Sequence, residues 1–142
     1  MKIKTSRFGD LEIDGGKILF LPEGVLGFPA HKRYILLDDD RQGPFIWLQA
    51  VDNPELAFIV IDPLALDESF DVRLYPKDLS ELKADGMRDV SFLVIVTVRR
   101  EEPPCIILNM QGPLAINHKK LVGKQLVLSS HDVPVLLVPQ AS

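Results

Sequence analysis

The chain has 142 residues, 46% of them hydrophobic, which is enough for one domain with its own buried core. Its formal net charge is −4, and the stretch from Asp38 to Asp71 holds nine acidic residues against one basic residue, Arg41. Such a surface would repel the phosphates of a nucleic acid and attract a basic partner, so we expect no direct binding of nucleic acid.

The first half of the chain predicts a series of short strands. Polar and apolar residues alternate over residues 1–13, and the two glycines at 15–16 predict the turn of a hairpin. Glycines and prolines within 22–29 predict an ordered bend. Three further strands are expected within 33–40 and 44–63, because the Asp, Asn and Pro residues between the apolar runs are typical of turns.

The second half predicts one helix among further strands. Residues 70–75 alternate, and the amphipathic segment from Pro76 to its stop at Gly86 predicts a short helix across an open end of the sheet. Residues 89–98 are almost continuously apolar and β-branched, which is typical of a central strand buried on both faces. Three more strands are expected within 104–110, 112–117 and 121–128.

Together these elements predict a mostly β, small single-domain fold with barrel-like closure and one short helix. Its core is expected to include the large apolar residues of the strands predicted within 44–63 and 89–98, namely Phe45, Trp47, Phe58, Ile59, Ile61, Phe92, Val94, Val96 and Val98. The single cysteine, Cys105, excludes a disulfide framework and a cysteine cluster for zinc, and we expect it to be a small buried hydrophobe.

Two general features bear on location. The start of the chain is charged where a signal peptide is apolar, and no apolar stretch reaches the ~20 residues of a membrane span. We therefore predict a cytoplasmic, soluble protein without a membrane partner.

No motif predicts catalysis. Gly123 and Lys124 lack the other residues of a phosphate-binding loop and lie in a strand pattern, where the glycine is expected to mark a bulge or a close backbone approach. The three histidines, at 31, 118 and 131, have no metal-site spacing, and the adjacent triad residue types at 129–132 do not make a triad by adjacency. We nominate no catalytic, cofactor or metal residue and predict a protein that is not an enzyme and has no cofactor.

The only local basic cluster is His118, Lys119, Lys120 and Lys124. RNA binding usually needs a longer basic stripe with aromatic side chains for stacking, and no aromatic residue follows Phe92. The remaining prediction is a β scaffold that acts as a binding module.

The motifs "MKIKTSRFGDLEID", "PEGVLGF", "PFIWLQAVDNPELAFIVIDP" and "LNMQGPLAINHKKLVGKQLVL", in this order, resemble the flagellar assembly factor FliW family from Met1 to about Leu128. The resemblance implies a single β-barrel-like domain over 1–142, with 131–142 as a flexible or docking tail, and no catalytic activity. It also implies binding of flagellin and of the translational regulator CsrA, whose repression of flagellin translation the protein would relieve. The alternative is a small β-barrel enzyme or ligand-binding protein of unrecognised type.

The flagellin site implied by the resemblance is an exposed strand edge or an apolar groove, because flagellin termini are amphipathic helices in the family picture. The candidates are apolar residues with few polar neighbours: Leu64, Leu66, Val135, Leu136 and Leu137. For the last three, simple packing of the tail onto the barrel is the alternative. The segment "PPCIILNM" is more apolar than we expect for the family.

The CsrA site is expected on acidic residues that flank two turns and would cluster if their strands are hairpin partners: Asp52, Glu55, Asp62, Asp67 and Glu68. An acidic surface docked beside an RNA-binding site would be attracted to the basic partner and would repel its RNA. The alternative is that these acids only keep a small domain soluble.

Overall fold

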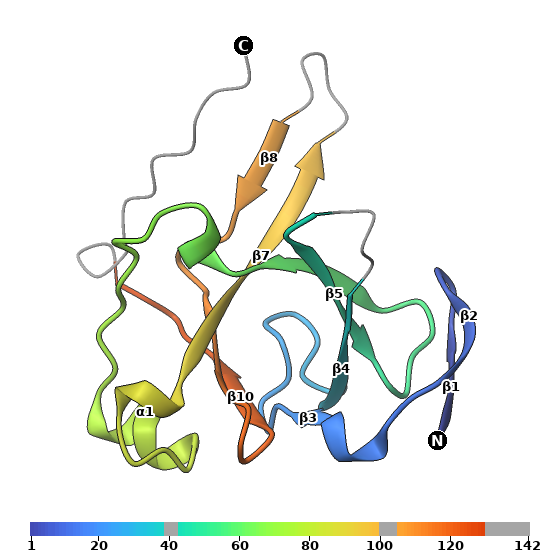
Figure 1. Ribbon diagram of the computed structural model, residues 1–142, viewed down its shortest axis with the longest axis horizontal. Coiled ribbons are helices and arrows are strands. Elements are labelled where there is room, and N and C mark those ends of the chain that lie inside the picture. Colours follow the sequence, from blue (N-terminus) through green and yellow to red (C-terminus); the bar gives the residue numbers. More distant parts are fainter. Residues whose placement is uncertain (39–42, 100–104, 130–142) are drawn as a thin grey trace.

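The computed structural model describes residues 1–38, 43–99 and 105–129 (Figure 1). In this part of the chain the strands are β1 (Lys2–Thr5), β2 (Gly9–Glu12), β3 (Leu19–Phe20), β4 (Arg33–Asp38), β5 (Phe45–Ala50), β6 (Ala57–Ile61), β7 (Ser91–Arg99), β8 (Cys105–Leu108), β9 (Leu114–Asn117) and β10 (Val122–Gln125). The helical elements are α1 (Pro76–Glu81) and the 3₁₀ turns η1 (Gly15–Lys17), η3 (Pro63–Ala65) and η4 (Met87–Asp89). The prediction of a mostly β fold with one short helix is therefore confirmed.

The main sheet closes on itself. Its strand order is β6-β5-β4-β3-β10-β9-β7-β8, and β6 also pairs with β7 from Ile59 opposite Val96 to Ile61 opposite Val94. Seven strands thus form a ring, which confirms the barrel-like closure, while β8 lies outside the ring and β1 and β2 form a separate hairpin (Figure 1).

No helix in the described ranges is long and apolar enough to cross a membrane.

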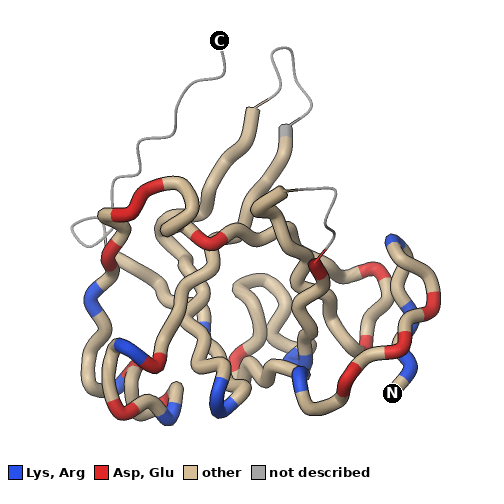
Figure 2. The backbone as a smooth tube through the Cα atoms, in the orientation of Figure 1, with Lys and Arg blue, Asp and Glu red and all other residues tan. Residues whose placement is uncertain are grey.

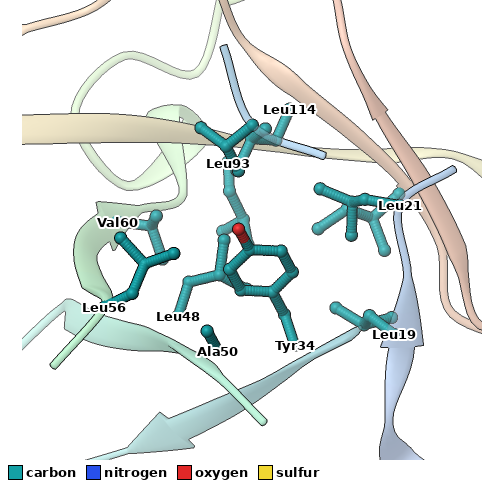
Figure 3. Close-up of a cluster of buried hydrophobic side chains, with 11 residues drawn as sticks. Leu19, Leu21, Tyr34, Leu48, Ala50, Leu56, Val60, Leu93 and Leu114 are labelled. Atoms are coloured by element: carbon teal, nitrogen blue, oxygen red, sulfur yellow. The ribbon is translucent and has the colours of Figure 1, made fainter. Parts of the chain in front are cut away.

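The ring encloses the main hydrophobic core (Figure 3). Successive side chains of a strand point to opposite faces, so alternate residues such as Leu48 and Ala50 of β5 face the interior. Tyr34 of β4 lies among them fully buried, and burial raises the pKa of its hydroxyl to about 12. The ring interior is therefore filled by side chains and serves as the scaffold.

Most of the predicted core is confirmed. Trp47, Ile61, Val94 and Val96 are buried, and the partly buried residues pack against the core clusters, namely Phe45, Phe58, Ile59 and Phe92.

Val98 is the exception: its prediction as core is wrong, because 48% of it is exposed. Beyond Val96, β7 leaves the ring and pairs only with β8, so its last residues are not buried on both faces. For the same reason the prediction for Cys105 is wrong, because this residue starts β8 and is exposed.

The first hairpin turns earlier than the glycine pair predicts. Thr5 pairs with Gly9, and the Thr5 hydroxyl accepts a hydrogen bond from Phe8 N at 2.8 Å and donates one to Gly9 O at 2.8 Å. Gly9 has a φ of 69°, a left-handed conformation that favours glycine. The pair at 15–16 instead forms η1, which Asp14 caps by accepting a hydrogen bond from Gly16 N.

The segment over 70–75 keeps its predicted alternation without joining a strand. Phe70, Val72 and Leu74 are buried and pack with Leu82 at the end of α1. The helix is shorter than predicted and ends at Glu81, because the chain turns into a left-handed conformation two residues later, at φ 54°. α1 lies beside β10 at one end of the ring (Figure 1).

Candidate functional site: an apolar groove with an acidic flank

The apolar surface of interest lies outside the ring, where β5 begins, β6 ends and β8 runs alongside (Figure 1). It is a hollow of about 390 Å³, which we call the β8 groove. Its lining consists of apolar side chains: Phe45, Ile61, Leu66, Ile106, Ile107, Leu108 and Met110.

The fold places these side chains by strand alternation. Ile61 shares the outer face of the ring with Val94 and Val96, and these three buried residues form the base against which Leu66 and Met110 pack. Leu66 follows η3, which is held in place by buried Pro63 and by Asp62, whose side chain accepts a hydrogen bond from Leu64 N at 2.9 Å.

The outer wall of the groove is β8. This strand pairs with β7 and lies at the end of the sheet order, and Ile106 and Ile107 are 55% and 40% exposed. A contiguous group of exposed aliphatic side chains is typical of a surface that another molecule covers. The groove can therefore bury apolar side chains of a partner.

The apolar residues predicted for a partner site fall partly on this groove. Leu66 lines it, and Leu64 is 51% exposed on the 3₁₀ turn just before. Val135, Leu136 and Leu137, with the rest of the tail over 131–142, lie outside the described residues. Whether any of them binds a partner stays a prediction.

Sequence reasoning missed β8 as the wall of the groove. Ile106, Ile107 and Met110 line the groove, and the first two are exposed, yet the sequence predicts them only as part of another strand. The signal was the unusually apolar segment 103–110 of the sequence, whose strand β8 lies outside the ring.

The acidic candidates lie in two groups, so the expectation that they cluster is wrong. Asp52 and Glu55 are in the turn that joins β5 to β6, whereas the second group follows the other end of β6, at 62–68. A hairpin brings together only the residues at its own turn, and the five residues of β6 separate the two groups by about 15 Å. Figure 2 shows the acidic positions spread around the molecule.

The two groups also differ in how their charge is compensated. Asp52 accepts hydrogen bonds from the Arg33 guanidinium at 3.0 and 2.5 Å, and this contact lowers the pKa of the Asp52 carboxyl. Asp67 is hydrogen-bonded to the hydroxyl and backbone N of Ser69, which lowers its pKa as well.

We call Asp62, Asp67 and Glu68 the acidic segment. Within the described residues none of the three forms an ion pair with a basic side chain. Their negative charge is therefore uncompensated, and along the chain they directly follow two residues that line the β8 groove, Ile61 and Leu66.

Lys124, from the Gly-Lys pair, has a structural role. Its ammonium lies 2.9 Å from Asp78 Oδ1 and 2.5 Å from Glu81 Oε2, so it joins β10 to α1. Burial opposes its charge, but the hydrogen bonds to Glu81 and Asp78 and the negative charges of these two carboxylates together outweigh burial and raise the pKa of Lys124. The expected close approach at Gly123 is confirmed, because a Cβ there would lie 3.2 Å from Ala115 O.

Comparison with known proteins matches nearly the whole chain. The family model described as FliW protein matches residues 2–137. A flagellar assembly factor FliW of Geotalea uraniireducens is 41% identical over 128 residues, which cover 90% of this chain and 77% of the relative. One of Geobacter sulfurreducens is 40% identical over 128 residues, with 90% and 79% covered. A crystal structure of the flagellar assembly factor FliW aligns with a TM-score of 0.86 at 32% identity and covers 100% of both chains.

Proposed function

Because the chain belongs to the FliW family of flagellar assembly factors, we propose that it is a non-catalytic cytoplasmic protein that binds flagellin and antagonises the translational regulator CsrA. The observation that carries the proposal is the β8 groove with the acidic segment at its edge. The apolar groove suits a partner that buries an apolar stripe of side chains, and the acidic segment suits a partner that presents basic residues.

Flagellin is the proposed occupant of the β8 groove. An amphipathic helix binds by laying its apolar face into an apolar groove with a polar rim. The exposed side chains of Ile106 and Ile107 supply the apolar contact, and the acidic segment supplies part of the polar rim. Burial of these isoleucines would then provide much of the binding free energy.

CsrA is the proposed partner of the acidic segment. A protein that binds RNA presents Lys and Arg to phosphate, so an acidic segment docked beside that site attracts the protein and repels its RNA. Exposed charges act over a Debye length of about 8 Å at physiological salt, so the docking site has to be adjacent to the RNA. Asp52 is less suited to this role, because Arg33 already neutralises it.

The flagellin proposal predicts that Ile107→Asp weakens flagellin binding about tenfold or more, because a buried unpaired charge opposes docking. Isothermal titration calorimetry with purified flagellin measures the change. Val127→Asp is the matched control, since Val127 is 80% exposed and lies outside the groove, and it should bind like the parent. Equal binding by Ile107→Asp in a protein with an unchanged melting curve would exclude the β8 groove.

The CsrA proposal predicts that Asp62→Asn, Asp67→Asn and Glu68→Gln together reduce displacement of RNA from CsrA. Asparagine keeps the oxygens that cap η3 and bond Ser69, so the backbone should stay in place. The reduction in RNA displacement should be larger at low salt than at raised salt, because salt screens exposed charges. Competition titrations against a CsrA–RNA complex at the two salt concentrations measure it.

The control is the double variant Asp52→Asn and Glu55→Gln, at the other end of β6. It should displace RNA nearly as well as the parent. If the triple variant displaces RNA as well as the parent at both salt concentrations, antagonism does not depend on the charge of the acidic segment. A loss in the double variant alone would move the site to the turn between β5 and β6.

A further inference from the structure

The β6–β7 ladder opens into a fork after its last pair, Ile59 opposite Val96. In an antiparallel pair the backbone groups of successive residues point alternately to the two sides of a strand. Asn109 N donates to Ile95 O at 2.9 Å, so the backbone groups of Ile95 face the β8 side. Those of Val96, and after it Val98, therefore face β6.

The opposite strand shows the same alternation. Ala50 N donates to Leu56 O at 2.9 Å, so the backbone groups of Leu56 face β5 and those of Ala57 face β7. The next hydrogen-bonded pair of the ladder would join Ala57 to Val98, but the ladder stops before them. Both residues direct their N–H and C=O groups into the fork, and within the described ranges nothing pairs with them. Unpaired strand edges of this kind can accept another strand.

A hollow of about 580 Å³ fills the fork, and Trp47 and Arg7 line it together with Ala57, Val96 and Val98. Trp47 is only 4% exposed, and its indole Nε1 has no hydrogen-bond partner among the residues that the structure describes. The indole ring of Trp47 therefore contributes apolar surface to the wall of the hollow.

Arg7 supplies a positive charge at the same place. Its guanidinium lies 4.1 Å from the centre of the Trp47 ring, and the turn that carries it is tied down by the bond from Ser6 N to Pro54 O at 2.9 Å. Glu55 lines the adjoining smaller hollow with Arg7, yet among the described side chains no carboxylate lies within ion-pair distance of Arg7.

From these features we infer that the fork binds an extended acidic segment of a protein partner as an added strand. The backbone of the segment pairs with Ala57 and Val98, one of its carboxylates meets Arg7, and an apolar side chain covers Trp47. A helix would leave the strand edges unpaired, and a basic segment would be repelled by Arg7. The residues that line the fork differ from those that line the β8 groove, so this site is distinct from the proposed flagellin and CsrA sites, although Val96 also belongs to the apolar cluster at the base of the groove.

Trp47 is the only tryptophan of the chain, so its fluorescence reports on the fork directly. The probe is the peptide acetyl-Val-Asp-Val-Asp-Val-amide, titrated into the intact protein up to millimolar concentration. We expect a saturable change in Trp47 emission and, in two-dimensional amide NMR, shifts at Ala57 and Val98. Absence of a saturable change would overturn the inference.

Two control peptides separate backbone pairing from charge. The same peptide with N-methyl groups on alternate amides keeps its side chains but loses donors, so it should bind much more weakly. The lysine counterpart, acetyl-Val-Lys-Val-Lys-Val-amide, should not bind. Equal binding by the N-methylated peptide would exclude strand addition, and equal binding by the lysine peptide would exclude an acidic partner.

The matched protein variants are Arg7→Gln and Arg73→Gln. The Arg73 guanidinium lies 5.4 Å from the centre of the Tyr75 ring, a similar contact between residues that do not line the fork. Arg7→Gln should raise the dissociation constant for the acidic peptide about fivefold or more, whereas Arg73→Gln should leave it unchanged. Equal effects of the two variants would show that the peptide responds only to net charge and would overturn the site.

Discussion

Replacing Leu48 by alanine is expected to lower the free energy of unfolding by about 3 to 5 kcal/mol, enough to threaten the fold. Leu48 is fully buried on β5, between Leu36 of β4 and Phe58 of β6. It faces the interior of the ring, where the surrounding strands are all hydrogen-bonded and cannot collapse readily into the cavity. Chemical denaturation followed by circular dichroism measures the loss.

The control for Leu48→Ala is Val98→Ala, which removes part of an aliphatic side chain from a strand that has left the ring. Because Val98 is 48% exposed, its change should cost less than about 1 kcal/mol. Similar losses in the two variants would mean that Val98 belongs to the core after all, or that the interior of the ring is not the main core.

Replacing Lys124 by methionine is expected to lower the free energy of unfolding by about 2 kcal/mol. The change leaves Asp78 and Glu81 without their shared cation while Asp78 is only 15% exposed. Removing one partner of a fully buried ion pair lowers the free energy of unfolding by roughly 3 to 5 kcal/mol, and partial exposure of the pair to solvent makes this loss smaller. Methionine matches the unbranched apolar stem of the lysine and lacks only its ammonium, so the loss reports mainly on charge rather than on packing.

The control for Lys124→Met is Lys77→Met on α1. Lys77 also contacts Glu81, but at 3.8 Å and with 83% of its side chain exposed, so its removal should change stability little. Urea denaturation of both variants measures the difference. Equal small effects would show that the contact of Lys124 with α1 contributes no stability.

The pKa shifts set the pH range in which the two variants differ. Burial alone would raise the pKa of Asp78, but the hydrogen bonds from Lys124 and from Tyr75 N, together with the charges of Lys124 and Lys77, outweigh burial and keep the pKa below 3.8. The stability from charged Asp78 is therefore present above pH 3.8 and lost as the pH falls through its lowered pKa. The pKa of Lys124 is raised above 10.5, so its contribution is present below pH 10.5 and lost as the pH rises through that raised pKa. The loss of unfolding free energy caused by Lys124→Met should be constant between the lowered pKa of Asp78 and the raised pKa of Lys124. This loss should become smaller in acid, where Asp78 is protonated.

The sequence by itself determined the class of fold and most of the elements. Alternation and turn residues depend on local backbone geometry, and they placed the strands around Trp47, Ile59 and Val94 in agreement with the structure. The apolar excess of 103–110 was also visible, although its meaning was not. Local chemistry therefore predicted which segments are strands and which side chains are apolar.

Only the tertiary structure decided which apolar side chains are buried. Val96 and Val98 are identical and two residues apart, yet β6 pairs with the first and stops before the second. Likewise Asp52 and Asp62 both end an apolar run, and the hairpin between β5 and β6 puts them at opposite ends of one strand. The groove, the fork and the position of each acidic group depend on pairings between residues distant in the chain, and a local pattern carries no information about where such a pairing ends.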